Sequence, residues 1–218
     1  VGDFTEGTGW QYTFFVPQHP EGLIALMGGD DAFVTKLDSL FSVEGDMGAE
    51  ASSDISGLIG QYAHGNEPSH HVAYLYPYAG QQWKTAEKVR YIDREFYTDS
   101  PDGIIGNEDC GQMSAWYIMS AMGFYQVNPS NGVFVFGSPL FPSLTLRLEN
   151  GRSFTVTAEG NSDTNIYIQS ATLNGQPYEK SYITYDDIMA GGELHFVMGD
   201  KPNKSFGAAP ESRPVSAQ

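Results

Sequence analysis

Two adjacent carboxylates, Glu108 and Asp109, stand in the segment GIIGNEDCGQMSAWY at positions 103–117, just before an apolar, aromatic run. Glycine and asparagine turn signals precede them, so the pair falls at a loop-to-helix junction, where the helix dipole favours ionised carboxylates. An ionised Asp109 could activate a water molecule, and the pair would also suit a calcium ion. An acidic helix N-terminus is the ordinary interpretation, and Cys110 beside it is expected to pack as a small hydrophobe.

The segment FTEGTGWQY at 4–12 places Glu6 close to Trp10 and Tyr12. A carboxylic acid beside aromatic rings can be kept protonated by desolvation, as a general acid requires. A loop acid that merely lies near core aromatics would give the same pattern. Taken alone, this stretch favours that simpler interpretation.

A third segment, QYAHGNEPSHHVAYLY at 61–76, crowds five polar residues into a few positions: His64, Asn66, Glu67, His70 and His71. Zinc would require histidine pairs at helical spacing or cysteine partners, which this spacing lacks. Calcium prefers oxygen ligands, which Asn66 and Glu67 supply. Calcium or contacts with sugar hydroxyls are therefore favoured over zinc. A helix start with Pro68 in its first turn explains the segment about as well.

The composition excludes several classes of function. The 218 residues carry a net charge of −16 with only 11 Lys plus Arg, which disfavours binding to nucleic acid or to an anionic membrane surface. One cysteine permits no internal disulfide, and the absence of a long apolar run predicts no membrane span. The chain begins without Met inside a dense motif, so we expect it to be a piece of a longer protein.

The elements that must position these residues change along the chain. Apolar residues at helical spacing predict helices over 30–41, 81–97 and 110–125, with Asp30 capping the first and Gly123 ending the last. From about 132 the pattern alternates, and Asn150-Gly151 and Asn174-Gly175 predict tight turns of an antiparallel sheet of about six strands. We therefore expect an α+β chain with a helical portion at 1–128, a sheet portion at 129–207 and a loose tail at 208–218.

Four motifs together resemble glycoside hydrolase family 92, the calcium-dependent exo-α-mannosidases. They are TEGTGWQYTFFVPQHPEGLIALMGG, HGNEPSHHVAYLY, GNEDCGQMSAWYIMSAMGFYQVNP, and NIYIQSATLNGQPY followed by GGELHFVMGDKPN. The resemblance covers about residues 2–207 and only the C-terminal part of the family's chain. It implies the C-terminal half of an (α/α)6 toroid followed by antiparallel strands of a β-sandwich. An N-terminal part of the same enzyme, or another chain, would then supply the rest.

The resemblance also implies roles for individual residues. Glu6 matches the general acid and Asp109 the general base of an inverting hydrolysis of terminal α-linked mannose, which requires carboxylates about 6.5–9.5 Å apart. Some members have Asp at the position of Asn107, so Asp109 is expected to carry the base function here. Asn66 and Glu67 are the candidate ligands of a calcium ion. The expected contacts with substrate are Trp10, His64, His70, Asn107 and Glu108.

The expected activity is thus that of an α-mannosidase acting on mannose-containing glycans such as N-glycans, outside the cytoplasm, in the periplasm or medium of a bacterium. The alternative is a non-catalytic carbohydrate-binding or structural remnant of a truncated glycosidase, since half a toroid cannot enclose its own site. A zinc hydrolase that uses the histidine segment is a third and weaker hypothesis. The sequence predicts neither the linkage preference nor the oligomeric state.

Overall fold

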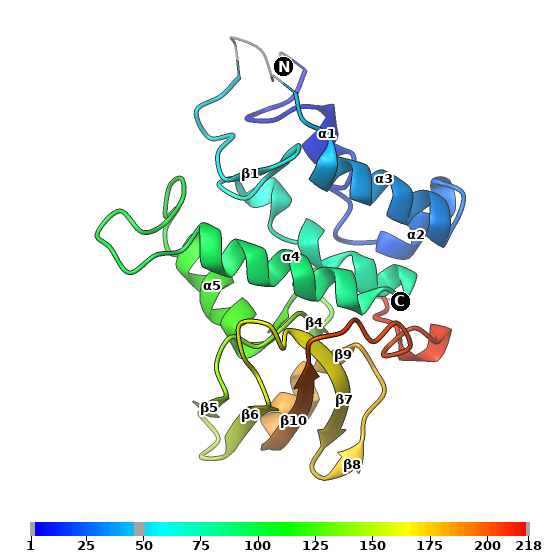
Figure 1. Ribbon diagram of the computed structural model, residues 1–218, viewed down its shortest axis with the longest axis vertical. Helices are drawn as coiled ribbons and strands as arrows, with labels where there is room; N and C mark the ends of the chain where they lie inside the picture. The colour runs from blue at the N-terminus through cyan, green and yellow to red at the C-terminus, as the bar shows by residue number, and fades with distance from the viewer. Residues whose placement is uncertain (1–2, 46–50, 217–218) are drawn as a thin grey trace.

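The computed structural model describes residues 3–45 and 51–216, which form a helical part followed by a part made of β-sheets (Figure 1). The helical part opens with α1 (Gly9–Tyr12), α2 (Pro20–Leu26) and α3 (Asp30–Ser42). It continues through the short hairpin of β1 (Leu58–Ile59) and β2 (Tyr62–Ala63) and the 3-10 turns η1 (Glu67–Ser69), η2 (Val72–Tyr74) and η3 (Tyr76–Ala79). It ends with α4 (Gln82–Glu95) and α5 (Gln112–Met122).

The three helices predicted from apolar spacing are confirmed as α3, α4 and α5, with ends that shift by a few residues. Gly123 ends α5 as predicted, because its φ of 108° is one that residues with a side chain rarely adopt. Asp30 is the first residue of α3 and does not cap it, since Gly29, with φ of 102°, stands at the cap. The apolar spacing thus located the helices, and glycines set the start of α3 and both ends of α5.

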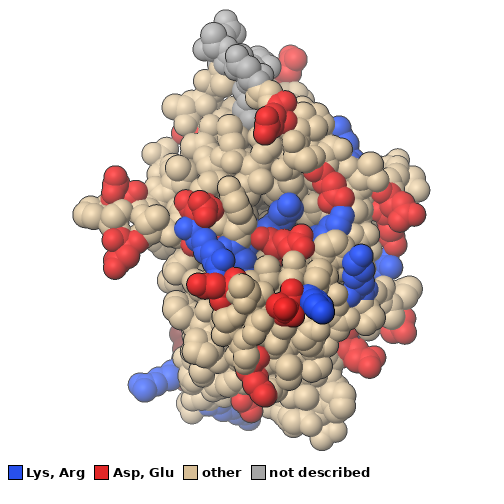
Figure 2. All heavy atoms as spheres, in the orientation of Figure 1, with Lys and Arg blue, Asp and Glu red and all other residues tan. Residues whose placement is uncertain are grey.

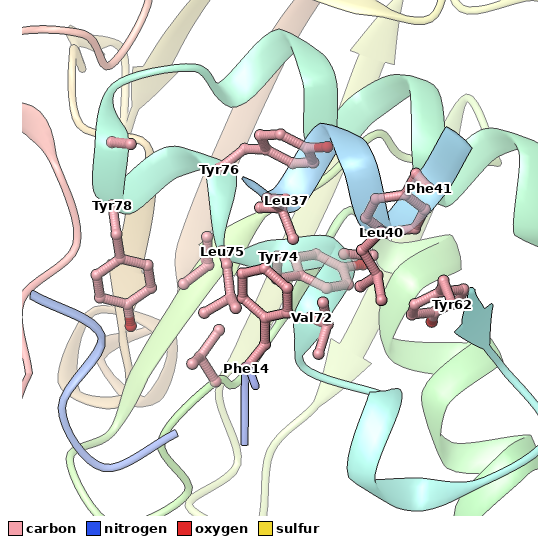
Figure 3. Close-up of a cluster of buried hydrophobic side chains, with 14 of the residues drawn as sticks. Phe14, Leu37, Leu40, Phe41, Tyr62, Val72, Tyr74, Leu75, Tyr76 and Tyr78 are labelled. Atoms are coloured by element: carbon pink, nitrogen blue, oxygen red, sulfur yellow. The ribbon is translucent and has the colours of Figure 1, made fainter. Parts of the chain in front are cut away.

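A cluster of buried side chains holds residues 58–81, the irregular segment that precedes α4, in place. Figure 3 shows part of it, with side chains from α3 and from the η2–η3 segment pointing toward one another. The labelled members are Phe14, Leu37, Leu40, Phe41, Tyr62, Val72, Tyr74, Leu75, Tyr76 and Tyr78. Burial of a large apolar side chain contributes about 1.5–3 kcal/mol, so a segment without long helices is still firmly anchored. The histidine segment is fixed by this core.

The sheet part contains two sheets. The smaller is antiparallel, in the order β3 (Phe124–Tyr125), β4 (Val133–Phe136) and β9 (Tyr182–Thr184). The larger has the order β5 (Ser143–Arg147), β6 (Ser153–Glu159), β10 (Gly192–Gly199), β7 (Tyr167–Leu173) and β8 (Gln176–Pro177). Helix α6 (Tyr185–Ala190) connects β9 to β10, and η4 (Pro210–Ser212) follows. The expectation of purely antiparallel strands is wrong, because β10 pairs parallel to β6 and antiparallel to β7.

Both predicted turns lie at hairpin ends. Asn174 and Gly175 join β7 to β8 with φ values of 51° and 77°, as a tight two-residue turn requires. The β5–β6 hairpin closes differently: the amide of Leu148 donates to the carbonyl of Arg152, which leaves a three-residue loop with only Gly151 at positive φ. The Asn150-Gly151 signal therefore found the hairpin but not its turn type.

Buried polar contacts join the two parts of the chain. Arg90 of α4 is 3% exposed and donates to the Ser138 hydroxyl at 3.0 Å and to the Pro139 carbonyl at 2.6 Å. The Gln82 amide donates to the Gly137 carbonyl at 2.7 Å. Figure 2 shows basic side chains gathered near the middle of the visible face, over α4, with acidic ones spread around them. The helix α4 therefore serves as the support on which the sheet part rests.

The C-terminal segment is held and is not the loose tail expected from its composition. Arg213 donates to the Asp30 carboxylate at 2.7 Å, and the amide of Ser216 donates to Glu21 at 2.6 Å. The backbone of Ser181 donates to the carbonyl of Ser212 at 2.8 Å. Residues 208–216 thus run back from the sheet part onto α2 and α3, beside the end of the chain marked in Figure 1.

Candidate active site

Three loops that carry the predicted chemistry meet at one end of the helical part. The side-chain amide of Asn66 donates to the backbone carbonyl of Glu6 at 2.9 Å, which joins the first loop to the histidine segment. The loop before α5 approaches the same segment so closely that a Cβ on Gly106 would lie 3.1 Å from the Cα of Gly65. Only glycine at 106 permits this approach, since its φ is also positive at 78°.

The carboxylates of the three loops lie close enough to affect one another's ionisation. The pKa of Glu67 is raised, first because the side chain is partly buried and then because the carboxylates of Asp109 and Glu6 lie close to it. A like charge nearby disfavours the ionised form in this way. The structure therefore brings together Glu6, Glu67 and Asp109, which are far apart in the sequence.

The backbone is strained where two of these acids stand. Among the described residues other than glycine, four have positive φ, and three of them lie in these loops: Glu6 at 52°, Asp109 at 49° and Cys110 at 59°. A left-handed conformation costs a residue with a side chain roughly 1–2 kcal/mol, so surrounding contacts must hold it there. The fourth, Asn174, is in a hairpin turn that requires that conformation. Strain at Glu6 and Asp109 orients their side chains and is typical of functional loops.

The two adjacent acids of the opening motif have different environments. The carboxylate of Glu108 accepts hydrogen bonds from the backbone amide of Ser114 at 3.1 Å and from its hydroxyl at 2.8 Å. It therefore caps the first turn of α5, as the ordinary interpretation of the pair would have it. Asp109, beside it, points toward Glu67. The carboxylate of Glu108 is thus bonded at the start of α5, and its predicted contact with substrate stays a prediction.

The histidines expected to contact substrate lie beneath the surface. His64 is 0% exposed, and its ring nitrogens bond the hydroxyls of Tyr62 at 2.9 Å and Tyr97 at 2.8 Å. The Tyr97 hydroxyl donates to the carbonyl of Met113, so it accepts from His64 Nε2, and Tyr62 donates to Nδ1. Both nitrogens are thereby used within the protein. In this geometry His64 lies beneath the surface with both ring nitrogens already bonded, and its predicted contact with substrate stays a prediction.

His70 is closer to the site but is also bonded within the protein. Its Nε2 donates to the carbonyl of His64 at 2.9 Å, and its own carbonyl accepts from the indole N–H of Trp116 at 2.9 Å. Burial lowers the pKa of His70 to about 4, and likewise that of His71, whose Nε2 bonds the carbonyl of Phe14 at 2.8 Å. These rings are therefore neutral near pH 7.

The remaining predicted contacts, Trp10 and Asn107, have other partners. Trp10 is partly buried against the helical core, with the ammonium of Lys36 3.9 Å from the centre of its ring. Asn107 is exposed, and its amide donates to the carboxylate of Asp54 at 3.2 Å. Neither is hydrogen-bonded to Glu6, Glu67 or Asp109 in the described part of the chain.

The side chains of Asn66 and Glu67 offer oxygen atoms, the type of ligand that calcium prefers. Asn66 and Glu67 contribute an amide and a carboxylate, and a cation beside Glu67 would offset the crowding of negative charge that raises its pKa. Within residues 3–45 and 51–216, no group of three or more His, Cys, Asp or Glu is arranged to hold a metal ion. These two side chains alone would supply only part of a calcium shell, which needs about six to eight oxygens.

A cavity of about 250 Å³ opens beside Glu67, and sequence reasoning missed two polar groups in its wall. They are Gln112, the first residue of α5, and Tyr125, which follows that helix; His70 and Pro17 also line the cavity. Gln112 follows Asp109 by three positions, at the start of the predicted apolar helix, and this closeness in the sequence was the available signal. The cavity extends the carboxylate cluster into a pocket large enough for part of a sugar ring.

The model of the glycosyl hydrolase family 92 catalytic domain matches residues 1–200. The chain belongs to this family. The family's four motifs in this sequence include all three loops that meet at the carboxylates. The resemblance expected from the sequence is thereby confirmed.

Solved structures of family 92 enzymes share the fold. One is an α-mannosidase of Bacteroides thetaiotaomicron in complex with mannoimidazole, 46% identical with a TM-score of 0.94, covering 98% of this chain and 28% of that chain. Another, described as an inverting mannosidase of the same organism, is 41% identical with a TM-score of 0.86, covering 98% of this chain and 30% of that chain. An uncharacterized secreted glycosidase of Arthroderma benhamiae is 32% identical over 211 residues, 95% of this chain and 25% of that protein.

The chain therefore spans between 25% and 30% of the length of these family 92 relatives. In the described ranges, no helix is both long and apolar enough to cross a membrane. The mixed helix-and-sheet architecture of the family 92 relatives is the one described above. Within it, the carboxylate cluster lies on the loops of the helical part.

Proposed function

We propose that this chain carries the general acid and the general base of a glycoside hydrolase that removes terminal α-linked mannose from glycans. The observation that supports this most directly is the meeting of Glu6 and Asp109 at Glu67, both on backbone held at positive φ. The mannose specificity rests on the mannosidases that share the fold. The helical part would form the C-terminal half of an (α/α)6 toroid, and the strands would belong to a β-sandwich.

In the proposed reaction, the carboxyl group of Glu6 donates its proton to the glycosidic oxygen as the bond from that oxygen to the anomeric carbon breaks. The carboxylate of Asp109 takes a proton from a water molecule, and that water's oxygen forms the new bond to the anomeric carbon from the opposite face. The products are free mannose with inverted anomeric configuration and the shortened glycan. Such an inversion requires room for a water between the two carboxylates, about 6.5–9.5 Å.

Asn66 and Glu67 would contribute oxygens to a calcium ion, with further ligands from water or from another part of the enzyme. When bound, calcium would supply a positive charge that orients sugar hydroxyls. The amide of Asn66 already fixes the backbone of Glu6 at 2.9 Å, so the same side chain would position the acid and the ion. Trp10 would give an apolar face to the sugar ring, and Asn107 an amide to its hydroxyls.

The proposed activity depends on more protein than this chain, because the chain matches less than a third of its family 92 relatives. The remaining part, in the same or another chain, would close the site over the sugar. The relative described as secreted supports an extracellular or periplasmic location, where N-glycans would be available as substrates. The second candidate function, a non-catalytic carbohydrate-binding remnant, is favoured by the same short coverage.

The test is hydrolysis of α-linked mannose disaccharides by the chain alone and by a full-length enzyme that contains it, each with calcium and with a chelator. Chelator-sensitive release of mannose by the full-length enzyme, lost in Glu6→Gln, is the expected result. Substantial disaccharide hydrolysis by Glu6→Gln would remove Glu6 as the acid. Binding of mannosides without any hydrolysis in either form would establish the remnant in place of the enzyme.

A further inference from the structure

The side-chain amide of Gln112 bridges two groups in the wall of the cavity beside Glu67. Its Nε2 lies 3.0 Å from Nδ1 of His70 and 3.0 Å from the hydroxyl of Tyr125. Gln112 begins α5, whereas Tyr125 follows its end, and all three side chains line the cavity together with Glu67. The bridge therefore ties both ends of α5 to the histidine segment.

The direction of each hydrogen bond follows from the groups involved. A carbonyl oxygen only accepts, so His70 Nε2 must carry a hydrogen for its bond to the carbonyl of His64. In a neutral ring Nδ1 then has a free lone pair and accepts from Gln112 Nε2. The amide nitrogen has no lone pair to offer, so its second hydrogen goes to the Tyr125 oxygen. The opposite orientation of the amide would place its oxygen against the Nδ1 lone pair.

The consequence falls on Tyr125. Its oxygen accepts from Gln112, and the hydroxyl hydrogen has no protein acceptor among residues 3–45 and 51–216. The ring is held in place by Tyr74, at 5.4 Å between ring centres, and by Trp116 at 6.2 Å. A rigid phenol in a cavity wall with a hydrogen still to donate is suited to a ligand oxygen.

The geometry points to Gln112 as a positioning residue that directs the Tyr125 hydroxyl hydrogen into the cavity beside Glu67, where it is donated to a hydroxyl oxygen of the sugar. This inference rests on the proposed function for the identity of the ligand. It adds to it a residue that touches substrate, Tyr125, and one that acts through Tyr125, Gln112. His70, anchored to the backbone by its other nitrogen, fixes the amide orientation on which the arrangement depends.

The first experiment reads the imidazole tautomer and needs no activity. Long-range proton–nitrogen NMR spectra of the chain at pH 7 should show His70 with hydrogen on Nε2 and none on Nδ1. The Gln112→Met variant, similar in size but without the amide, should shift the His70 Nδ1 resonance while the spectrum of His195, on β10 of the larger sheet, stays unchanged. A His70 ring protonated on Nδ1 would overturn the inference, because Gln112 would then present its oxygen.

The second experiment uses the full-length enzyme and compares Tyr125→Phe with Tyr91→Phe, a change at an exposed ring on α4 that is 48% exposed. Loss of one hydrogen bond to substrate should raise KM about 5–10-fold in Tyr125→Phe, with a smaller change in kcat. Tyr91→Phe should behave as wild type. An unchanged KM in Tyr125→Phe, with mannosidase activity intact, would overturn the substrate contact and leave the proposed function standing.

The Gln112→Glu variant tests whether the residue acts through Tyr125. A carboxylate only accepts, so Tyr125 would donate to it and no longer to the sugar, and KM should rise about as much as in Tyr125→Phe. Adding Tyr125→Phe to Gln112→Glu should then cause no further rise, since coupled residues are not additive. Additive effects would overturn the positioning role. If no form of the enzyme hydrolyses mannosides, the proposed function fails while the NMR result still decides the amide bridge.

Discussion

The loops of the helical part and the strands of the sheet part differ in backbone conformation. In the loops, Glu6, Asp109 and Cys110 stand at positive φ, and their glycines permit close approach of backbones. In the larger sheet, the strand β10 is paired on both sides, with one register shift against β7 between Val197 and Met198, and it buries Leu194, Phe196 and Met198 on one face. Backbone strain is concentrated in the loops where the carboxylates meet, and the buried packing of apolar strand residues lies in the sheet part. Chemistry and stability should therefore respond to different substitutions.

The largest effect is expected for Asp109→Asn. If Asp109 activates the water, the rate of mannoside hydrolysis by the full-length enzyme should fall about 10²–10⁴-fold, as for other acid–base groups. The unfolding temperature should stay the same or rise, because the substitution removes a negative charge next to Glu67. Rates and thermal unfolding measured on the same preparation check this. A loss of less than about tenfold would move the base role to another residue.

The converse substitution is Phe196→Ala in the sheet. Phe196 is 0% exposed and packs edge-on against Phe136, with 5.0 Å between ring centres. Its removal should lower the free energy of unfolding by about 3–5 kcal/mol, while the activity of the folded fraction stays near that of wild type. Denaturant unfolding measures the free-energy change, and mannoside hydrolysis measures the activity. The control is Ile118→Ala, at a side chain that is 55% exposed. Lost activity in a fully folded Phe196→Ala protein would contradict the separation of the two regions.

Much of this comparison could be predicted from the sequence, because local signals produce local structure. Apolar spacing located α3, α4 and α5, and Asn174-Gly175 located a turn. The three loops were recognised from their acids and histidines, and the family resemblance joined them. Their meeting is encoded partly in glycines such as Gly106, which read from sequence only as turn signals.

The rest depended on contacts between distant residues. Alternation shows which face of a strand is buried but not its neighbour, so the parallel pairing of β10 with β6 could not be read. The bond from Arg213 to Asp30 that holds the tail joins opposite ends of the chain. For the same reason, the different roles of Glu108 and Asp109 became visible only once Ser114 and Glu67 were in place.

A pH-dependent effect is expected at the junction that separates the two regions. Asp93 of α4 is 4% exposed, neither of its carboxylate oxygens has a partner among the described groups, and burial raises its pKa to about 8. The unfolded value is about 3.9, so between about pH 4 and pH 8 the folded chain holds a proton that the unfolded chain lacks. Asp93 should then contribute a slope by which stability falls as pH rises, by up to about 1.4 kcal/mol per pH unit. The buried His70 and His71, whose pKa values are lowered to about 4, contribute with the opposite sign below about pH 6.5, so the slope of Asp93 is measured as the difference between variant and wild type.

The substitution Asp93→Asn should remove that slope, and Asp99→Asn in the exposed loop after α4 should keep it. Denaturant unfolding at several values between pH 5 and pH 9 measures it. Arg90 on the same helix, and the hydroxyls of Tyr74, Tyr97 and Tyr117, are the titratable groups that face Asp93. A slope unchanged by Asp93→Asn would mean that Arg90 keeps the carboxylate ionised throughout.

The smallest effect is expected for Glu108→Gln, next to the residue with the largest. The amide can still accept one hydrogen bond at the start of α5 but loses the charge that strengthens both bonds to Ser114, so stability should fall by about 1 kcal/mol. Mannoside hydrolysis should fall less than threefold. Rate and unfolding measurements on both Glu108→Gln and Asp109→Asn decide whether the first acid caps the helix while the second acts in catalysis. If Glu108→Gln loses as much rate as Asp109→Asn with its fold intact, the capping contact does not describe the acid's role, and both carboxylates belong to the catalytic cluster.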